Sequence, residues 1–560
     1  MSAPFWTERY DAGVPHTLRP YPEEGLPDVL RRAALEAGEA TALWFKGRRM
    51  TYAELERESE AFARGLLKLG IQKGGRVALL LPNSPQMLIA EFGIWKAGAV
   101  AVPMNPLYSE AELEHAFGEC GAAAAVVLAP FYAKVAALRD RRPEGPLRLL
   151  IPTGIGEYLP PFKRLLFTLF KERRSGHRVV ALCDDPTFRS VLESGRRGGA
   201  LPPPPGPRDP ALFLFSGGTT GTPKCALSTH QALVVSGSQI VAWFSVILSG
   251  AADPIMLNMP LFHVYAQAGI MPASLCGRHP MALVPNPRDL DDLLSAIRAV
   301  RPSVLPGVPT LFTSLIAHPR VRRERGLLRS VKLSVSGAAP LMQETKERFE
   351  ALTGGRIVDA YSLTEMTLAG TFSPILGEYK PGSVGVPLPD VEVRIVSAEG
   401  GMEPLGPNEV GEVLMRAPQM MEGYWGKPRE SDAAFRDGWL LTGDLGYQDG
   451  DGYLFIVDRK KDVIKPGGFQ VWPREVEEVV ARHPAVREVG VAGVPDPRQG
   501  EAVKAWVVLE EGAGLALEEL RAHCRRELAA YKVPRFLECV ASLPKSQVGK
   551  VLRRQLRGDD

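Results

Sequence analysis

The first 200 residues alternate between segments with helical spacing of apolar residues and short continuous apolar runs. Residues 55–69 place apolar and polar side chains on opposite sides of a helix, and Gly70 ends the pattern. Residues 76–81, 98–102 and 122–128 are apolar runs of the length of buried strands. Because strands that alternate with helices form parallel sheets covered on both faces, this region is predicted to be α/β.

A proline-rich segment, residues 201–210, interrupts this pattern and reads as a semi-rigid linker. A buried strand is predicted directly after it, at 211–215, and helix–strand alternation then continues to residue 440. Within this part, residues 382–416 carry period-2 segments such as 391–396 and 409–415. These segments predict a β-rich region.

The last hundred residues have a different character. A charged run at 458–462 precedes two predicted helices, 473–482 and 517–528. Two predicted strands, 488–494 and 502–509, are interleaved with these helices. The pattern indicates a small α+β domain behind a polar hinge.

Composition limits the classes of protein that this chain can form. With about 100–200 residues per domain, 560 residues allow about three to five structural units. Hydrophobic residues make up 45% and charged residues 23%, which excludes a disordered, collagen-like or disulfide-dense protein. The 67 basic residues nearly cancel the 64 acidic ones, so no global field favours nucleic acid.

Targeting and redox signals point to the cytoplasm. The N-terminus lacks the apolar core of a signal peptide, and the most apolar stretch, 240–252, is shorter than the ~20 residues that span a bilayer. The cysteines are scattered, without Cys-x-x-Cys pairs or zinc-ligand spacing, which fits a reducing compartment. They are Cys120, Cys183, Cys225, Cys276, Cys524 and Cys539.

A loop rich in glycine and hydroxyl groups, residues 216–224, follows the predicted strand at 211–215. Glycines let the backbone approach an anion closely, and the adjacent hydroxyl and N–H groups can donate to phosphate. It is not a Walker A loop, because Lys224 lies between Pro223 and Cys225. The loop predicts a phosphate site, with a flexible surface turn as the alternative.

Four further stretches follow this loop along the chain: 361–365 (YSLTE), 438–444 (GWLLTGD), 458–462 (DRKKD) and 544–550 (PKSQVGK). Their order and spacing match those of the motifs of a known superfamily. Together the five stretches resemble the adenylate-forming superfamily of acyl-CoA synthetases, firefly luciferase and peptide-synthetase adenylation domains. The resemblance covers the chain from about residue 25 to 555. It is strongest to bacterial long-chain fatty-acid–CoA ligases, because of the Gly-Gly-Thr-Thr-Gly form of the loop.

The resemblance implies how the chain would bind ATP and Mg²⁺. The loop at 216–224 would hold the departing pyrophosphate, and Glu365 would bind Mg²⁺ with the Thr220 hydroxyl nearby, as suits a hard cation. Tyr361 would stack on adenine, beside the turn at 336–340. The alternatives are a solvated or capping acid for Glu365 and a core tyrosine for Tyr361.

Asp444 and Arg459 would bind the ribose hydroxyls, because a carboxylate accepts two O–H bonds and a guanidinium donates in a fixed fork. A turn aspartate is the alternative for Asp444. The full set expected to contact the nucleotide or coenzyme A is Ser216, Gly217, Gly218, Thr219, Thr220, Gly221, Lys224, Gly337, Ala338, Asp359, Ala360, Tyr361, Thr364, Asp444, Arg459, Gly467, Gly468 and Phe469.

Three residues are predicted to be catalytic. Lys550 would reach the substrate carboxylate and the α-phosphate and stabilise the adenylation transition state, unless it belongs to a solvated basic tail with Arg553 and Arg554. His263 would lie beside the reacting carboxylate and gate an acyl tunnel; a satisfied core histidine is the alternative. Lys465 would act in the second step, with a surface lysine equally open.

In the superfamily, the C-terminal domain rotates about its hinge between the two half-reactions, which would make Lys461 the hinge residue here. After rotation, Gly467, Gly468 and Phe469 would line the entrance for the pantetheine arm of coenzyme A. Cys225 and Ser362 stand where the superfamily commonly has glycine, and these two departures put loop flexibility and nucleotide affinity in question. Gly467 stands where serine is common in the loop of the thioester step.

Pattern and resemblance together predict an α/β fold with a large N-terminal adenylation domain of stacked mixed sheets and helices at 1–457. This domain includes a β-rich subdomain at about 375–457. A small mobile α+β C-terminal domain, 458–560, follows with its hinge at 458–462. The predicted activity is ATP- and Mg²⁺-dependent synthesis of acyl-CoA from a fatty acid, through acyl-AMP.

Three alternatives stay open for the function: a medium-chain or aryl acid–CoA ligase, an acyl-AMP ligase that loads a carrier protein, and a non-catalytic lipid-binding descendant. The expected partners are fatty acid, ATP and coenzyme A, with no nucleic acid beyond the nucleotide. Chain-length preference and oligomeric state, including a homodimer, are not determined by the sequence.

A basic amphipathic segment at 161–174 is the one feature outside these motifs that suggests a lipid substrate. Phe162, Leu165, Leu166, Leu169 and Phe170 follow helical spacing, and Lys163, Arg164, Lys171, Arg173 and Arg174 flank them. Such a helix either rests on an anionic membrane surface or packs on its own domain. The sequence leaves both readings open, so peripheral membrane association is an expectation only.

Overall fold

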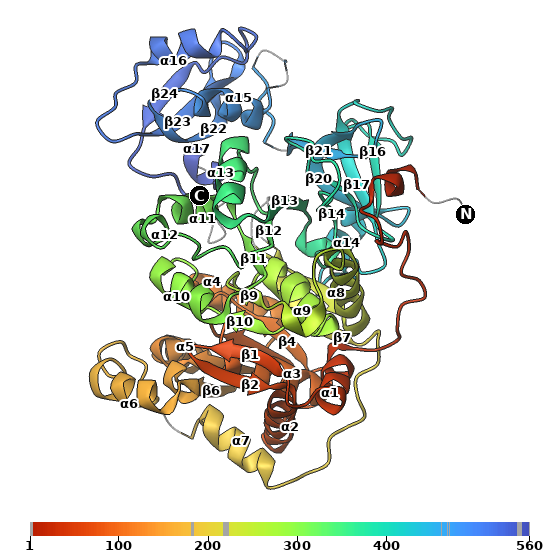
Figure 1. The fold of residues 1–560 in the computed structure, drawn as a ribbon, viewed down its shortest axis with the longest axis vertical. Helices are drawn as coiled ribbons and strands as arrows, with labels where there is room; N and C mark the ends of the chain where they lie inside the picture. Colours follow the sequence, from red (N-terminus) through yellow and green to blue (C-terminus); the bar gives the residue numbers. More distant parts are fainter. Residues whose placement is uncertain are drawn as a thin grey trace.

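The computed structural model describes residues 4–180, 184–216, 223–460, 462–466, 469, 471–545 and 551–558. Strands within this part of the chain form sheets of nine, seven, five and three strands. In Figure 1 the two larger sheets and their helices fill the lower and middle parts of the view, the five-stranded sheet lies at the upper right, and the three-stranded sheet at the upper left. The predicted α/β class is confirmed.

The nine-stranded sheet is parallel through its centre and antiparallel at both edges. Its central strands are short and buried on both faces, as is typical of parallel strands covered by helices. In spatial order the strands are β15 (Val386–Pro387), β14 (Thr371–Phe372), β13 (Arg356–Tyr361), β12 (Leu333–Ser336), β11 (Val304–Gly307), β9 (Ile255–Leu257), β10 (Met281–Leu283), β1 (Thr41–Phe45) and β2 (Arg48–Thr51).

The seven-stranded sheet contains the predicted strands at 76–81, 122–128 and 211–215. Its last two strands turn back antiparallel, so that Ser216 and Lys224 face each other across β7 and β8. The glycine-rich loop is therefore a connection between two paired strands. In spatial order the strands are β18 (Gly423–Tyr424), β8 (Lys224–Thr229), β7 (Pro210–Ser216), β4 (Val100–Pro103), β3 (Arg76–Leu80), β5 (Ala124–Leu128) and β6 (Leu149–Thr153).

Helices cover both sheets, and the helix predicted at 55–69 is α2. The Thr51 side chain caps its first turn by accepting from the N–H of Glu54. The helices of this part are α1 (Leu26–Glu36), α2 (Tyr52–Lys68), α3 (Pro85–Lys96), α4 (Glu110–Cys120), α5 (Ala129–Arg141), α6 (Pro161–Phe170), α7 (Phe188–Arg196), α8 (His230–Phe244), α9 (Met271–Cys276), α10 (Leu290–Val300), α11 (Pro309–Ala317), α12 (Pro319–Arg323) and α13 (Gln343–Thr353).

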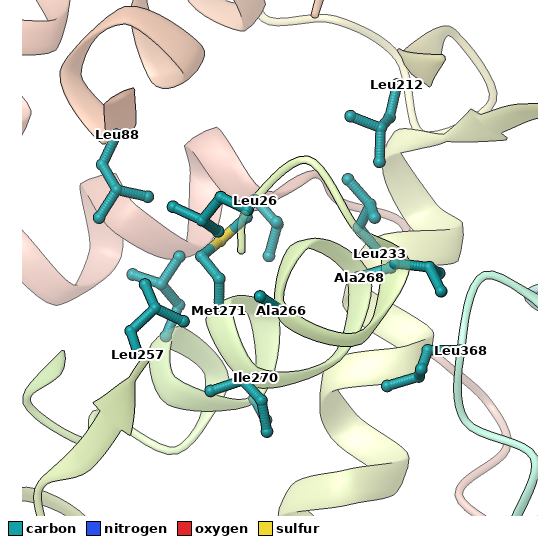
Figure 2. Close-up of a cluster of buried hydrophobic side chains, with 14 of the residues drawn as sticks. Leu26, Leu88, Leu212, Leu233, Leu257, Ala266, Ala268, Ile270, Met271 and Leu368 are labelled. Carbon is teal, nitrogen blue, oxygen red and sulfur yellow. The ribbon is translucent and has the colours of Figure 1, made fainter. Parts of the chain in front are cut away.

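The largest hydrophobic core joins the two larger sheets. Every residue of α3 is buried, as expected for a helix that is apolar around most of its circumference. Figure 2 shows part of this core, where Leu212 of β7 and Leu257 of β9 lie on either side of the π-helix η4 (Tyr265–Ile270) and α9. The remaining short helices of this part are η1 (Phe5–Arg9), η2 (Ile155–Tyr158), η3 (Gly250–Ala252) and η5 (Thr364–Met366).

The β-rich region forms an antiparallel sheet in which β20 is central. The strands predicted at 391–396 and 409–415 are β16 and β17, displaced by one or two residues. The elements of this region are β16 (Glu392–Val396), β17 (Gly411–Arg416), α14 (Pro428–Ala434), β19 (Phe435–Arg436), β20 (Trp439–Gln448) and β21 (Leu454–Arg459).

The C-terminal elements have a separate core that includes Val476, Val491 and Leu520. Both predicted strands are present, but the helix predicted at 517–528 ends at Cys524 and continues as turns. Two of the elements, β24 and α17, were not predicted from the sequence. The elements are α15 (Pro473–Ala481), β22 (Val486–Asp496), β23 (Gly500–Leu509), α16 (Leu517–Cys524), β24 (Phe536–Cys539) and α17 (Arg553–Arg557).

Helix α6, predicted from the amphipathic segment, lies at the lower left edge of Figure 1 and has no buried residue. None of the described helices is long and apolar enough to cross a membrane. The apolar stretch at 240–252 is divided between the end of α8 and the short helix η3.

Candidate active site

Tyr361, Asp444 and Arg459 form one polar cluster where two sheets meet. Asp444 and Arg459 face each other on β20 and β21, and Tyr361 ends β13 of the nine-stranded sheet. The Tyr361 hydroxyl donates to Asp444 Oδ2 at 2.7 Å, and Arg459 Nε lies 3.2 Å from Asp444 Oδ1. Burial, with the Asp444 charge, raises the pKa of Tyr361 well above its usual value, so its hydroxyl stays a donor.

Glu365, Tyr424 and Lys224 form a second cluster beside the glycine-rich loop. The Tyr424 hydroxyl donates to Glu365 Oε1 at 2.8 Å, and Lys224 Nζ lies 5.0 Å from the centre of the Tyr424 ring. Tyr424 belongs to β18 and pairs with Ala226 of β8, two residues after Lys224. The cluster thus places a cation and a carboxylate at the point where the loop rejoins the sheet.

The turn after β12 contributes two of the predicted nucleotide contacts. The Gly337 N–H donates to the Gly307 carbonyl at 3.2 Å, and Ala338 has a φ of +67°, in the left-handed region. The Tyr265 ring lies against Gly337. Its hydroxyl donates to the Val335 carbonyl at 2.8 Å and fixes the ring behind the turn.

Asp359 and Ala360 precede Tyr361 on β13. Burial raises the pKa of Asp359 to about 6, although the Tyr379 hydroxyl donates to its Oδ2 at 3.1 Å. The carboxyl therefore changes charge near neutral pH at the edge of the predicted nucleotide site. Ala360 pairs with Phe372 of β14, which leaves its small side chain half-buried.

The segment after Glu365 is conformationally strained. Thr364 begins η5, and the three residues after this helix, Thr367, Leu368 and Ala369, have φ values of +50°, +60° and +44°. Left-handed backbone at non-glycine residues costs free energy and needs support from its surroundings. The support comes from hydroxyl contact between Ser228 and Thr367 at 2.8 Å and from the Gln419 amide, which donates to the Ala369 carbonyl.

His263 lies just before the π-helix η4. Its Nδ1 accepts from the N–H of Tyr265 at 3.3 Å, and its carbonyl accepts from the N–H of Gln267. Burial lowers the pKa of His263 to about 4, so the imidazole is neutral at physiological pH. π-Helices are rare and occur frequently at functional sites.

Lys465 and Phe469 lie with the C-terminal elements and not in either cluster. The Lys465 N–H donates to Glu501 Oε2 at 2.6 Å, and its side chain is exposed. The Phe469 ring is 57% exposed and stacks on Tyr531 with ring centres 4.7 Å apart. Both side chains are accessible from solvent.

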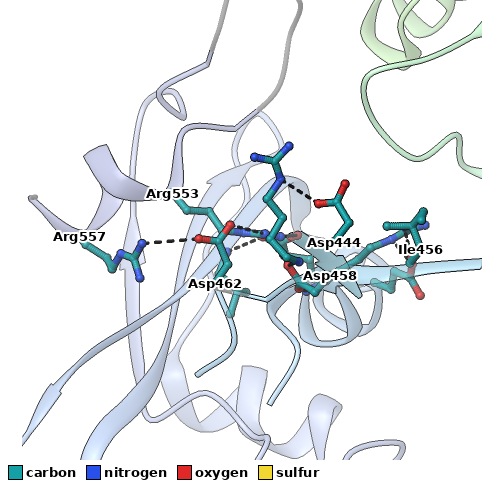
Figure 3. Close-up of polar contacts among 11 residues, drawn as sticks. Asp444, Ile456, Asp458, Asp462, Arg553 and Arg557 are labelled. Atoms are coloured by element: carbon teal, nitrogen blue, oxygen red, sulfur yellow. Dashed lines mark hydrogen bonds and ion pairs between the residues drawn. The ribbon is translucent and has the colours of Figure 1, made fainter. Parts of the chain in front are cut away.

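A third polar network, shown in Figure 3, links β21 to the last helix of the chain. Arg553 Nη1 lies 2.9 Å from Asp458 Oδ1, and its Nη2 lies 2.8 Å from Glu477 Oε2. Asp462 Oδ2 is 3.4 Å from Arg553 Nη1. Only 17% of the Arg553 side chain is exposed, so this residue is not part of a solvated basic tail.

Two residues of these networks were not found by sequence reasoning. Tyr424 lies outside the five motifs, and the only local signal for it is the aromatic pair Tyr424-Trp425 after a predicted β-rich region. Arg553 entered the sequence prediction only through the alternative of a solvated basic tail, because its partners are up to 95 residues away in sequence. The remaining predicted residues lie outside the described part of the chain: Gly217, Gly218, Thr219, Thr220, Gly221, Lys461, Gly467, Gly468 and Lys550.

The fold combines stacked α/β sheets with a β-rich unit and a small C-terminal unit, and the clusters lie at the sheet junctions. This arrangement defines the class of nucleotide-binding enzymes that form adenylates. The chain belongs to the family of AMP-binding enzymes. Residues 30–425 match that family, and residues 475–550 match the AMP-binding enzyme C-terminal domain.

Curated relatives match over the whole chain. A long-chain-fatty-acid–CoA ligase from Bacillus subtilis is 38% identical over 98% of this chain and 97% of its own length. Another from Yersinia pestis is 38% identical over 99% and 98%, respectively. Among solved structures, ATP-bound MatB from Rhodopseudomonas palustris superposes with a TM-score of 0.82 at 27% identity, covering 96% of this chain and 99% of that chain.

Proposed function

We propose that this protein is an ATP- and Mg²⁺-dependent long-chain fatty-acid–CoA ligase. The observation that carries the proposal is the position of Tyr361 and Glu365 at the two ends of one short segment, each joined to its own cluster. Four residues of chain span at most about 14 Å when fully extended, and the start of η5 at Thr364 shortens this distance. One segment can therefore set both the adenosine end and the phosphate end of ATP.

In this proposal, Asp444 accepts hydrogen bonds from the ribose hydroxyls, with Arg459 and the Tyr361 hydroxyl orienting the carboxylate. The Tyr361 ring and the turn at Gly337 and Ala338 form the adenine pocket. The buried position of Asp444, whose side chain is 6% exposed, supports this role because a preoriented acceptor loses little freedom on binding.

Glu365 would hold Mg²⁺ together with the Thr220 hydroxyl. Mg²⁺ is commonly bound through one or two carboxylates plus substrate phosphates, and a single carboxylate with one oxygen oriented by Tyr424 fits that donor set. The ion would neutralise charge on the phosphates. The loop at 216–224 and Lys224 would then hold the departing pyrophosphate.

The first half-reaction joins the substrate to AMP. A carboxylate oxygen attacks the α-phosphorus, the new O–P bond forms, and pyrophosphate leaves as its bond to that phosphorus breaks. Lys550 would stabilise the charge that develops between the two anions. His263, neutral at physiological pH, would lie beside the carboxylate and gate the acyl tunnel without adding charge.

The second half-reaction transfers the acyl group to coenzyme A. The thiol sulfur attacks the acyl carbon, its proton passes to solvent, the C–S bond forms, and AMP leaves with the electrons of the C–O bond. Residues 458–560 would rotate about the hinge at 458–462, with Lys461 as the pivot, and replace Lys550 by Lys465, Gly467, Gly468 and Phe469. The exposed side chains of Lys465 and Phe469 support this exchange.

The long-chain substrate is supported by relatives named for that activity, 36–38% identical over nearly the whole chain. A fatty acid of this kind partitions into membranes, so the enzyme would work in the cytoplasm with peripheral membrane contact through residues 161–174. The exposed apolar side chains of α6 support this location.

The oligomeric state is tested separately. Sedimentation velocity of the purified protein distinguishes a monomer from a homodimer.

The test is a scan of pyrophosphate release with saturated acids of about 6 to 18 carbons and with aryl acids, each with and without coenzyme A. We expect the highest kcat/KM with long chains, and acyl-CoA as the product. A maximum at short chains or aryl acids removes the long-chain assignment. Adenylate formation that never proceeds to a coenzyme A ester favours loading of a carrier protein.

A further inference from the structure

Helix α6 carries its apolar stripe on the outside of the molecule. Phe167 turns inward, with its ring against Gly156 and 5.7 Å from the His177 ring centre. The stripe side chains face solvent instead and are 40–71% exposed: Phe162, Leu165, Leu166, Leu169 and Phe170. A contiguous exposed apolar surface of this kind marks an interaction site.

The charges around the stripe indicate the partner. Residues 161–174 contain five basic side chains and Glu172 as the one acid. A second copy of this chain would bring the same positive charge against the stripe and repel it. An anionic lipid surface supplies both an apolar interior and the opposite charge.

An open cavity of about 260 Å³ adjoins α6, which contributes Arg164 to its wall. The other lining residues come from β2, α2, η2 and α7. Its charged lining residues are Arg48, Glu54, Arg57, Glu58, Glu157, Arg164, Arg189 and Arg196. The lining is therefore basic in balance, although three carboxylates are present.

The carboxylates of the cavity already have partners. Glu58 binds Arg196 through both oxygens, at 2.8 and 2.7 Å. Glu54 and Glu157 accept from backbone N–H groups at the start of their own helices, at 2.9 and 2.8 Å. Burial also raises the pKa of Glu157 above its usual value.

Three arginines of the cavity lie within ion-pair distance of no carboxylate among the described residues, although the charge of one, Arg164, acts on Glu157; the three are Arg48, Arg57 and Arg164. The Arg48 guanidinium lies over the Tyr158 ring, 5.1 Å from its centre, which orients it without neutralising it. Guanidinium groups match phosphate oxygens with paired hydrogen bonds.

We infer that this cavity binds the phosphate headgroup of an anionic membrane lipid while α6 inserts its apolar stripe into the same leaflet. The inference adds an anionic lipid as a partner of the enzyme. It rests on the proposed function only in taking the substrate to be a long-chain acid dissolved in the membrane. Headgroup binding would orient the N-terminal domain on the surface from which long-chain acids are taken.

The experiment is flotation of the full-length protein with phosphatidylcholine vesicles, alone and with about 25% phosphatidylglycerol. The test variant is Arg57→Gln/Arg164→Gln. The matched control, Arg322→Gln/Arg323→Gln, removes two exposed arginines of α12 that lie outside the cavity. We expect wild type and control to bind the anionic vesicles, and the test variant to bind them about tenfold or more weakly.

Equal binding by the test variant and the control overturns the inference, as does unchanged binding by Phe162→Asp/Phe170→Asp. Binding of inorganic phosphate at about 10 mM by wild type but not by the test variant, with equal vesicle binding by the two proteins, would assign the cavity to free phosphate instead. A dimer that dissociates in Phe162→Asp/Phe170→Asp, without vesicle binding by wild type, would assign the stripe to a second copy. Vesicle binding is read independently of product formation, so loss of catalysis with every acid removes the proposed function alone.

Discussion

Replacement of Arg553 by methionine tests the network that links the end of the chain to β21. The substitution keeps much of the aliphatic volume and removes the guanidinium. It leaves Asp458, whose side chain is 1% exposed, and Glu477, 19% exposed, without their shared cation. Breaking a buried ion pair by removal of one partner costs about 3–5 kcal/mol, because the remaining charge is desolvated and uncompensated.

We expect this cost to fall on the C-terminal unit, because Arg553 joins α17 and α15 to β21. Hydrogen exchange of the full-length protein measures it directly: a loss of about 3–5 kcal/mol lowers protection of β22 and β23 by about 10²- to 10⁴-fold. The control is Arg482→Met in the same unit. Its ion pair with Glu527 has side chains 53% and 45% exposed and is worth about 0–1 kcal/mol.

The same variant reports on catalysis, because Arg553 lies three residues after Lys550. If the network positions this segment, adenylate formation falls more than thioester formation from supplied acyl-AMP. Exchange protection within about threefold of the Arg482→Met control would refute the reasoning about buried charge.

Three further predictions concern the site and the core. Lys550→Ala should lower adenylate formation by about two or more decades while transfer from synthetic acyl-AMP survives, and equal loss of both half-reactions contradicts its role. Tyr424→Phe removes the donor to Glu365 and should lower kcat/KM for adenylation by about tenfold, with a raised requirement for Mg²⁺; an unchanged magnesium titration contradicts this. Glu91 is fully buried, accepts from the Gln267 amide, and has its pKa raised to about 8 by burial. Because the folded-state pKa exceeds the ordinary 4.5, wild-type stability should fall as pH rises from about 4.5 to 8, and urea unfolding of Glu91→Gln should lack this slope.

Local patterns in the sequence determined much of the fold. The helix α2 and the strands β3, β5 and β7 follow from spacing that repeats every 3.6 residues or from short apolar runs. Three of the five motifs contain Tyr361, Asp444 and Arg459, each in a recognisable local frame, and the structure brings these residues together. The pairing of Asp444 with Arg459 across β20 and β21 agrees with that expectation.

Only the tertiary structure decided which distant groups share a site. Tyr424 reaches Glu365 across 59 residues and Arg553 reaches Asp458 across 95, and no local signal encodes such pairs. Helix α6 gives the clearest contrast. The helical spacing of its apolar residues determined which side chains share a face. This spacing is the same whether the face packs inward or meets solvent. The direction was set by Phe167 packing against Gly156 and His177, and this contact left the apolar stripe exposed.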